Sequence, residues 1–217
     1  MTDLINIFSP AAYLVAREGE RLGPVPANKA FAYVLAGDGL FKMARSRHLT
    51  AMVRVTTWRQ PLPGLQLMDH PTLGRWPMLP ASLLDACLDH ARRVAWARPV
   101  EQLYQFFIRG KRVHVHRPEQ AGSAGQILYS AMEIDPADVI LDLHSHHNMA
   151  ASFSGTDDRD ETGFQVYGVI GRIHTRPEVR FRVGVYGDFA PIPASQVFHG
   201  TINLLDRFYD RRGERLS

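Results

Sequence analysis

The alternation of apolar and polar positions predicts a β-rich region at the start of the chain. Short runs with the length and residue types of strands occupy residues 31–36, 40–44 and 49–57. The sequence Gly37-Asp38-Gly39 between the first two runs is typical of a hairpin turn. Residues 60–80 are rich in proline and glycine and predict a connection. We therefore expect a small β-rich N-terminal region over residues 1–75.

A helix followed by several strands is predicted for the rest of the chain. Apolar residues recur at helical spacing after Pro80, and Pro99 ends the pattern. Strand-like runs follow, and residues 201–209 predict a terminal helix. These runs occupy residues 102–108, 112–116, 126–132, 139–143, 164–172 and 179–186. Residues 144–161 are polar and predict a loop, without a strand, in which a helix begins. This order favours an α/β sheet domain over residues 76–217.

Composition narrows the class of protein. The chain has 217 residues, of which 45% are hydrophobic and 22% charged, as in a globular protein. We expect no membrane span, no signal peptide and a cytoplasmic location. A single cysteine, Cys87, excludes an intramolecular disulfide and a cysteine-rich zinc site, and its apolar setting predicts a core position. The net charge of +3 is too small to favour nucleic acid as a partner.

The candidate chemistry lies in the polar segment after the apolar run 139–143. His144 and His146 are two residues apart, so on an extended chain both imidazoles point to one face and can approach one metal ion. Asp157 supplies an oxygen ligand. Two histidines and one carboxylate leave a fourth tetrahedral position open, which is typical of catalytic rather than structural zinc.

Two further residues fit a hydrolytic site around such an ion. Ser154 lies three residues before Asp157 at the start of the predicted helix, where it could donate a hydrogen bond to a developing oxyanion. Glu101 lies at the start of the strand-like run 102–108. If that strand lies beside 139–143, Glu101 can face the metal and act as general base and acid. Glu119 and Glu133 are alternatives for this role.

Other histidines and acids have simpler interpretations. His114 and His116 form a second His-x-His pair, which we interpret as ordinary strand residues. His147 is interpreted as a contact behind the ligands, a substrate contact or an exposed residue. Asp158 could replace Asp157 as ligand in a shifted register, although the spacing favours Asp157.

The pattern His144-x-His146-x7-Ser154-x2-Asp157, with Glu101 upstream, resembles the motif of JAB/MPN (JAMM) metalloproteases. The resemblance covers roughly residues 80–190. The longer stretch 144–173, which begins HSHHNMAASFSGTDD, and the following RVGVYGDF at 182–189 are similar to the JAB-like proteins of plasmid-borne bacterial PRTRC cassettes. The chain departs from the family at His147, where many members have proline, and after Glu101, where many have glycines.

The resemblance implies an MPN fold, which is a cytidine-deaminase-like mixed sheet flanked by helices. It implies one zinc ion per chain, held by His144, His146 and Asp157, with Ser154 and Glu101 as catalytic residues. The implied activity is cleavage of an amide bond by a zinc-activated water. The implied substrates are peptides or ubiquitin-like proteins cut after their C-terminal tail, and the implied partners are other proteins of a PRTRC cassette.

Two other functions remain open from the sequence. A non-catalytic MPN interaction module in a PRTRC-type assembly would bind partners after loss of its metal ligands. A DNA-linked role would show steeply salt-dependent nucleic-acid binding.

Overall fold

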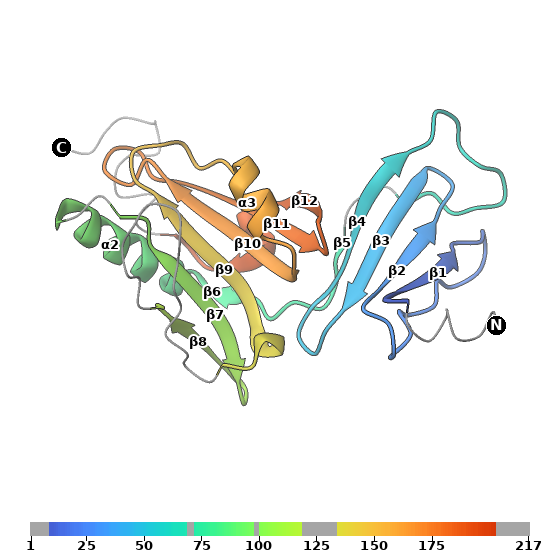
Figure 1. The fold of residues 1–217 in the computed structure, drawn as a ribbon, viewed down its shortest axis with the longest axis horizontal. Helices are drawn as coiled ribbons and strands as arrows, with labels where there is room; N and C mark the ends of the chain where they lie inside the picture. Colours follow the sequence, from blue (N-terminus) through green and yellow to red (C-terminus); the bar gives the residue numbers. More distant parts are fainter. Residues whose placement is uncertain (1–8, 69–71, 98–99, 119–133, 203–217) are drawn as a thin grey trace. The chain divides into compact units, whose positions relative to one another are not determined.

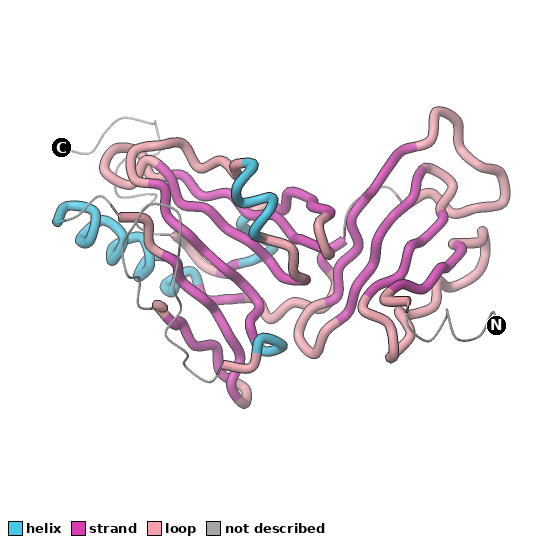
Figure 2. The backbone as a smooth tube through the Cα atoms, in the orientation of Figure 1, coloured by secondary structure: helices cyan, strands magenta, loops and turns pink. Residues whose placement is uncertain are grey.

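The computed structural model describes residues 9–68, 72–97, 100–118 and 134–202. The described chain falls into two compact units. The first comprises the described residues of Met1–Trp76, Glu161–Phe164 and Val183–Ala190, and the second comprises those of Pro77–Asp160, Gln165–Arg182 and Pro191–Ser217. Sheets with few helices make the protein a mixed α/β structure, as predicted at this coarse level (Figure 2).

The first sheet has five strands in the order of the sequence. They are β1 (Ala11–Val15), β2 (Phe31–Leu35), β3 (Gly39–Arg45), β4 (Thr50–Thr57) and β5 (Thr72–Leu73). Strands β2 and β3 pair antiparallel through the predicted turn, and a Cβ at Gly39 would lie 2.3 Å from the Thr56 carbonyl oxygen. The core beneath includes Val34, Phe41 and Met52. The three predicted strands are confirmed, whereas β1 was not predicted.

The second sheet has six strands in the order β12-β11-β10-β9-β7-β8 (Figure 1). Their bounds are β7 (Leu103–Arg109), β8 (Arg112–His116), β9 (Val139–His146), β10 (Phe164–Gly171), β11 (Glu178–Val185) and β12 (Asp188–Ile192). Central β9 runs parallel to β10 and antiparallel to β7. Two-residue strands β6 (Leu79–Pro80) and β13 (Phe198–His199) form a separate pair. The remaining short elements are η1 (Pro136–Asp138) and α4 (Ala194–Val197).

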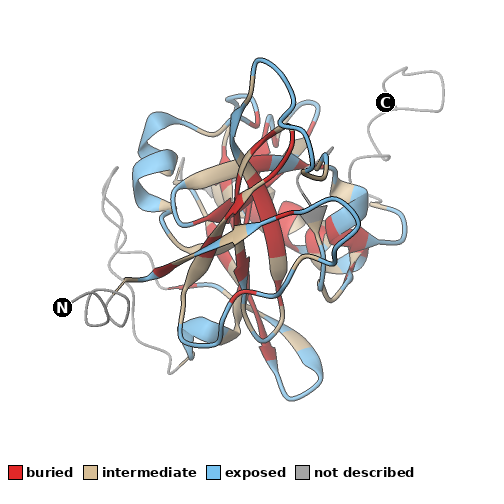
Figure 3. Ribbon diagram, turned by 90° about the vertical axis from the view of Figure 1, so that its right-hand side faces the viewer, coloured by how far each residue is buried: buried red, intermediate tan, exposed pale blue. Residues whose placement is uncertain are grey.

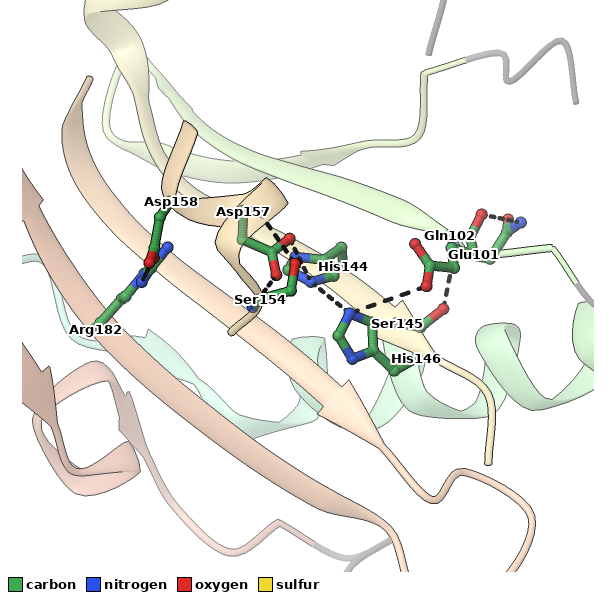
Figure 4. Close-up of polar contacts among 9 residues, drawn as sticks. All are labelled: Glu101, Gln102, His144, Ser145, His146, Ser154, Asp157, Asp158 and Arg182. Atoms are coloured by element: carbon green, nitrogen blue, oxygen red, sulfur yellow. Dashed lines mark hydrogen bonds and ion pairs between the residues drawn. The ribbon is translucent and has the colours of Figure 1, made fainter. Parts of the chain in front are cut away.

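Two helices lie on opposite faces of this sheet. Helix α2 (Ala81–Ala97) buries the apolar residues that predicted it, among them Leu84, Cys87 and Leu88. Burial raises the pKa of the Cys87 thiol to about 12, in keeping with its expected core position. The short helix α3 (Gly155–Asp160) lies on the other face (Figures 1 and 4). Many of the buried residues lie in the strands (Figure 3).

One expectation for the second sheet was wrong. The polar segment 144–161 was expected to contain no strand, but β9 continues through His146. The backbone is held there on both sides, because Leu103 of β7 pairs with His144 and Gly171 of β10 pairs with His146. The polar side chains of residues 144–146 give no apolar strand pattern, so this part of β9 is defined only by its pairing with β7 and β10.

Other expectations have mixed outcomes. Helix α2 and the strands at 102–108, 112–116, 139–143, 164–172 and 179–186 are confirmed to within a few residues, and β12 was not predicted. The connection 60–80 contains the two-residue strands β5 and β6. The predicted strand 126–132 lies outside the described residues, as does most of the predicted helix 201–209. Among the described residues, no helix has the length and apolarity needed to cross a membrane.

Candidate metal centre

Strand β9 presents two imidazoles on one face of the sheet. Side chains alternate along a strand, so Leu141, Leu143 and Ser145 point into the buried face that α2 covers. His144 and His146 point to the opposite face, and their Nε2 atoms lie 3.1 Å apart. The placement of both histidines on one face agrees with the spacing argument.

Helix α3 brings the Asp157 carboxylate to the histidines. The Asp157 backbone N–H donates to the Ser154 hydroxyl at 3.2 Å, and the Ser154 N–H donates to Asp157 Oδ2 at 2.5 Å. This reciprocal pair is a capping box, which fixes the first turn of the helix. The second carboxylate oxygen, Oδ1, lies 3.4 Å from His144 Nε2. The cap therefore occupies one oxygen and leaves the other facing the imidazoles (Figure 4).

The three donor groups have the spacing of ligands to one ion. Their nearest nitrogen and oxygen atoms all lie within 4.8 Å of one another. At zinc–ligand distances of about 2.0–2.1 Å, the ligands of a tetrahedral ion are separated by roughly 3.3 Å. His146 Nε2 lies 3.1 Å and Asp157 Oδ1 lies 3.4 Å from His144 Nε2, which matches this ligand–ligand separation. These two separations therefore fit a tetrahedral ion, in which three protein ligands leave one position for a further ligand.

The protonation states of two of these groups suit metal binding. Burial lowers the pKa of His144 to about 4 against the opposing effect of Asp157, so its ring is neutral at pH 7. Burial would raise the pKa of Asp157, but the Ser154 N–H and hydroxyl and the two imidazoles hold it below its ordinary value. A neutral imidazole and an ionised carboxylate are the forms that bind a metal.

Glu101 lies beside His146, at the entrance of strand β7. Its Oε1 atom is 3.9 Å from His146 Nε2, and about half of its side chain is exposed. The condition on which this prediction rested, that β7 lies beside β9, is met by their pairing. Ser145 holds the backbone next to Glu101 in place. Its N–H donates to the Gln102 carbonyl oxygen at 2.9 Å, and its hydroxyl oxygen accepts the Gln102 N–H at 3.0 Å. The alternatives Glu119 and Glu133 lie outside the described residues.

Arg182 on β11 is a site residue that the sequence reasoning missed. Its buried guanidinium donates to Asp158 Oδ1 at 2.5 Å and lies 4.0 Å above the ring of Phe153. Phe153 in turn makes an edge contact with His144. Arg182 thus holds both ends of the segment that carries Ser154 and Asp157. Asp158 pairs with Arg182 and does not belong to the candidate ligand group, so the structure favours Asp157.

The loop between β9 and α3 folds back tightly over the end of β10. A Cβ at Gly171 would lie 2.2 Å from the Ala151 backbone nitrogen, so only glycine permits this approach. The N–H groups of Arg172 and Ile173 donate to the carbonyl oxygens of Met149 and His147 at 2.8 and 2.9 Å. These contacts define the path of the chain from His146 to Ser154.

The remaining predicted histidines lie outside the candidate ligand group. His147 buries its Nε2 atom without a hydrogen-bond partner among the described residues. His114 of β8 stacks on Phe107, with ring centroids 5.3 Å apart, and is exposed as expected for an ordinary strand residue.

A second polar group, formed by Gln105, Asp142 and Gln165, lies next to the histidines on the same face of the sheet. Asp142 accepts hydrogen bonds from the side-chain amides of Gln105 on β7, at 3.2 Å, and Gln165 on β10. Burial raises the pKa of Asp142 to about 6 despite these hydrogen bonds. The sequence pattern alone does not indicate a role for this residue.

Comparisons with protein-family models, curated proteins and solved structures found no match.

Proposed function

We propose that the protein is a zinc-dependent peptidase or isopeptidase with an MPN-type fold in its second unit. The observation that carries the proposal is the gathering of the donor atoms of His144, His146 and Asp157 within 4.8 Å of one another, with Glu101 beside them. The resemblance of their spacing to the JAMM motif supports the same conclusion.

The residues of the chain have distinct roles in this proposal. Zinc held by His144, His146 and Asp157 would supply a Lewis acid that polarises the scissile carbonyl and acidifies water. Glu101 accepts a proton at Oε1 and returns it to the leaving amine. Its exposed side chain and its position next to His146 suit this shuttle.

Ser154 contributes through its hydroxyl hydrogen. The hydroxyl oxygen accepts the Asp157 N–H, and its single hydrogen, which serves the Asp157 carboxylate in this structure, would turn to donate to an oxyanion that develops beside the ligands. The same residue therefore positions a ligand and stabilises negative charge. The proposed substrates are peptides or the C-terminal tails of ubiquitin-like proteins, and proteins of a PRTRC-type cassette are the proposed partners.

The first test of the proposal is the zinc content of the purified chain, measured by elemental mass spectrometry beside Asp157→Ala. We expect close to one zinc per wild-type chain and much less in the variant. A matched control is Asp160→Asn, since Asp160 is an exposed carboxylate of the same helix outside the ligand group. Absence of zinc from the wild type after incubation with zinc at neutral pH would refute the metal site.

The second test separates catalysis from metal binding. Glu101→Gln should keep its zinc and lose hydrolysis of ubiquitin-like conjugates and tailed peptides, because the amide cannot accept the proton. Full hydrolysis by this variant would refute the assigned role. A zinc-loaded wild type that hydrolyses none of these substrates would favour the non-catalytic interaction module.

A further inference from the structure

The group formed by Gln105, Asp142 and Gln165 lies in the row of side chains next to the candidate ligands. Asp142 and His144 are successive residues on one face of β9, so their backbones are about 7 Å apart. Gln105 is the cross-strand partner of Asp142, as Leu103 is of His144. All three side chains of the group are partly exposed. The group is therefore open in part to solvent beside the candidate ligands.

The chemistry of this group is that of a cation receptor. Both glutamine amides donate their N–H groups to the Asp142 carboxylate, so each keeps its carbonyl oxygen as an acceptor. The carboxylate and the two carbonyl oxygens offer only acceptors. Among the residues that the structure describes, no lysine, arginine or histidine pairs with Asp142.

A half-buried carboxylate that has no cation among the described residues around it is costly to hold. Removing a charge from water costs free energy unless an opposite charge or sufficient hydrogen bonds replace the water. If these hydrogen bonds served only to link β7, β9 and β10, a neutral acceptor at position 142 would be enough. The charge is therefore in excess of what the sheet requires, and a cationic ligand would compensate it.

We propose that Gln105, Asp142 and Gln165 form a subsite for a lysine or arginine side chain of the substrate, on a residue flanking the scissile amide. This inference rests on the proposed peptidase function, because it assumes that a peptide lies across His144 and His146. An extended lysine or arginine side chain spans the distance from the ligand row to the Asp142 row. The subsite would thus select basic sequences for cleavage.

The test uses the full-length, zinc-loaded protein and peptides that differ in one charge. Two mixtures of ten-residue peptides carry lysine or norleucine at one fixed position, and a second pair carries arginine or citrulline. Binding is measured by enrichment on immobilised protein at pH 8, and cleavage by mass spectrometry of the products. We expect the cationic member of each pair to be enriched about tenfold over its neutral match.

The variant Asp142→Asn removes the charge and keeps a side chain that can both accept and donate within the glutamine pair. Its preference for the cationic peptides should fall below threefold at unchanged zinc content. Glu18→Gln, an exposed carboxylate of the first unit, makes the same change in net charge and should behave as the wild type. The arginine–citrulline pair tests the wild type directly if the variant does not fold.

The outcomes separate this inference from the proposed activity. Enrichment of cationic peptides that depends on Asp142 but is not followed by cleavage supports the subsite and counts against the peptidase. Cleavage of both members of each pair at equal rates overturns the subsite and leaves the peptidase standing. Equal binding of both members without cleavage also overturns the subsite.

Discussion

Acid should destabilise the metal-free protein through His144, and the size of the effect follows from its burial. In the unfolded chain this imidazole has its ordinary pKa of 6.5, whereas burial lowers the pKa to about 4 in the folded protein. Between these two values the unfolded state binds a proton that the folded state does not. Stability therefore falls as the pH falls below about 6.5, and the loss is nearly complete near pH 4.

One pH unit of difference between the two pKa values corresponds to about 1.4 kcal/mol. The contribution of His144 at pH 4 is therefore a loss of about 3 kcal/mol relative to pH 7. This is a large share of the roughly 5–15 kcal/mol that stabilises an ordinary domain.

The assay is urea unfolding of chelator-treated protein at pH 4, 5, 6 and 7, compared with His144→Gln, which cannot titrate. The stability of the wild type relative to this variant should fall by about 3 kcal/mol between pH 7 and pH 4. His114→Gln, which removes an exposed imidazole, serves as the control and should follow the wild type. Parallel pH profiles for wild type and His144→Gln would show that burial does not suppress protonation of His144.

Two further predictions concern the groups that position the ligands. Arg182→Met should weaken zinc binding about tenfold in competition with a chelator, because the segment that carries Asp157 loses its ion pair with Asp158; unchanged affinity would contradict the positioning role. Gly171→Ala should lower the free energy of unfolding in urea by about 1–3 kcal/mol, because the new Cβ would collide with the Ala151 backbone. Gly155→Ala, where a Cβ meets only a flexible arginine at 3.9 Å, should be tolerated.

The sequence predicts those parts of the site that depend on local spacing. The i, i+2 relation places His144 and His146 on one face, and the Ser-x-x-Asp spacing brings Ser154 and Asp157 together in a capping box. Strand and helix periodicity likewise predicts α2 and most strands of both sheets. These features depend on backbone geometry that operates over a few residues.

Features that depend on the order of strands were beyond the sequence. Glu101 reaches His146 only because β7 pairs with β9 across a separation of some 40 residues, and Arg182 reaches Asp158 from another strand. The extension of β9 through the polar residues follows from pairing on both sides and has no apolar pattern. The sequence pattern does not indicate a site at Asp142, because its hydrogen-bond partners Gln105 and Gln165 lie on other strands.

The arrangement of these groups has an energetic cost that the proposed ligands would offset. His144 is held neutral by burial, the Arg182 guanidinium is taken out of water, and the Asp142 carboxylate is desolvated on the same sheet face. Apolar side chains of similar volume would fill these positions at no such cost, since buried charges seldom add net stability. Groups that oppose folding gather at functional sites, where a ligand compensates them. A metal ion at the imidazoles and a cation at Asp142 would each supply that compensation.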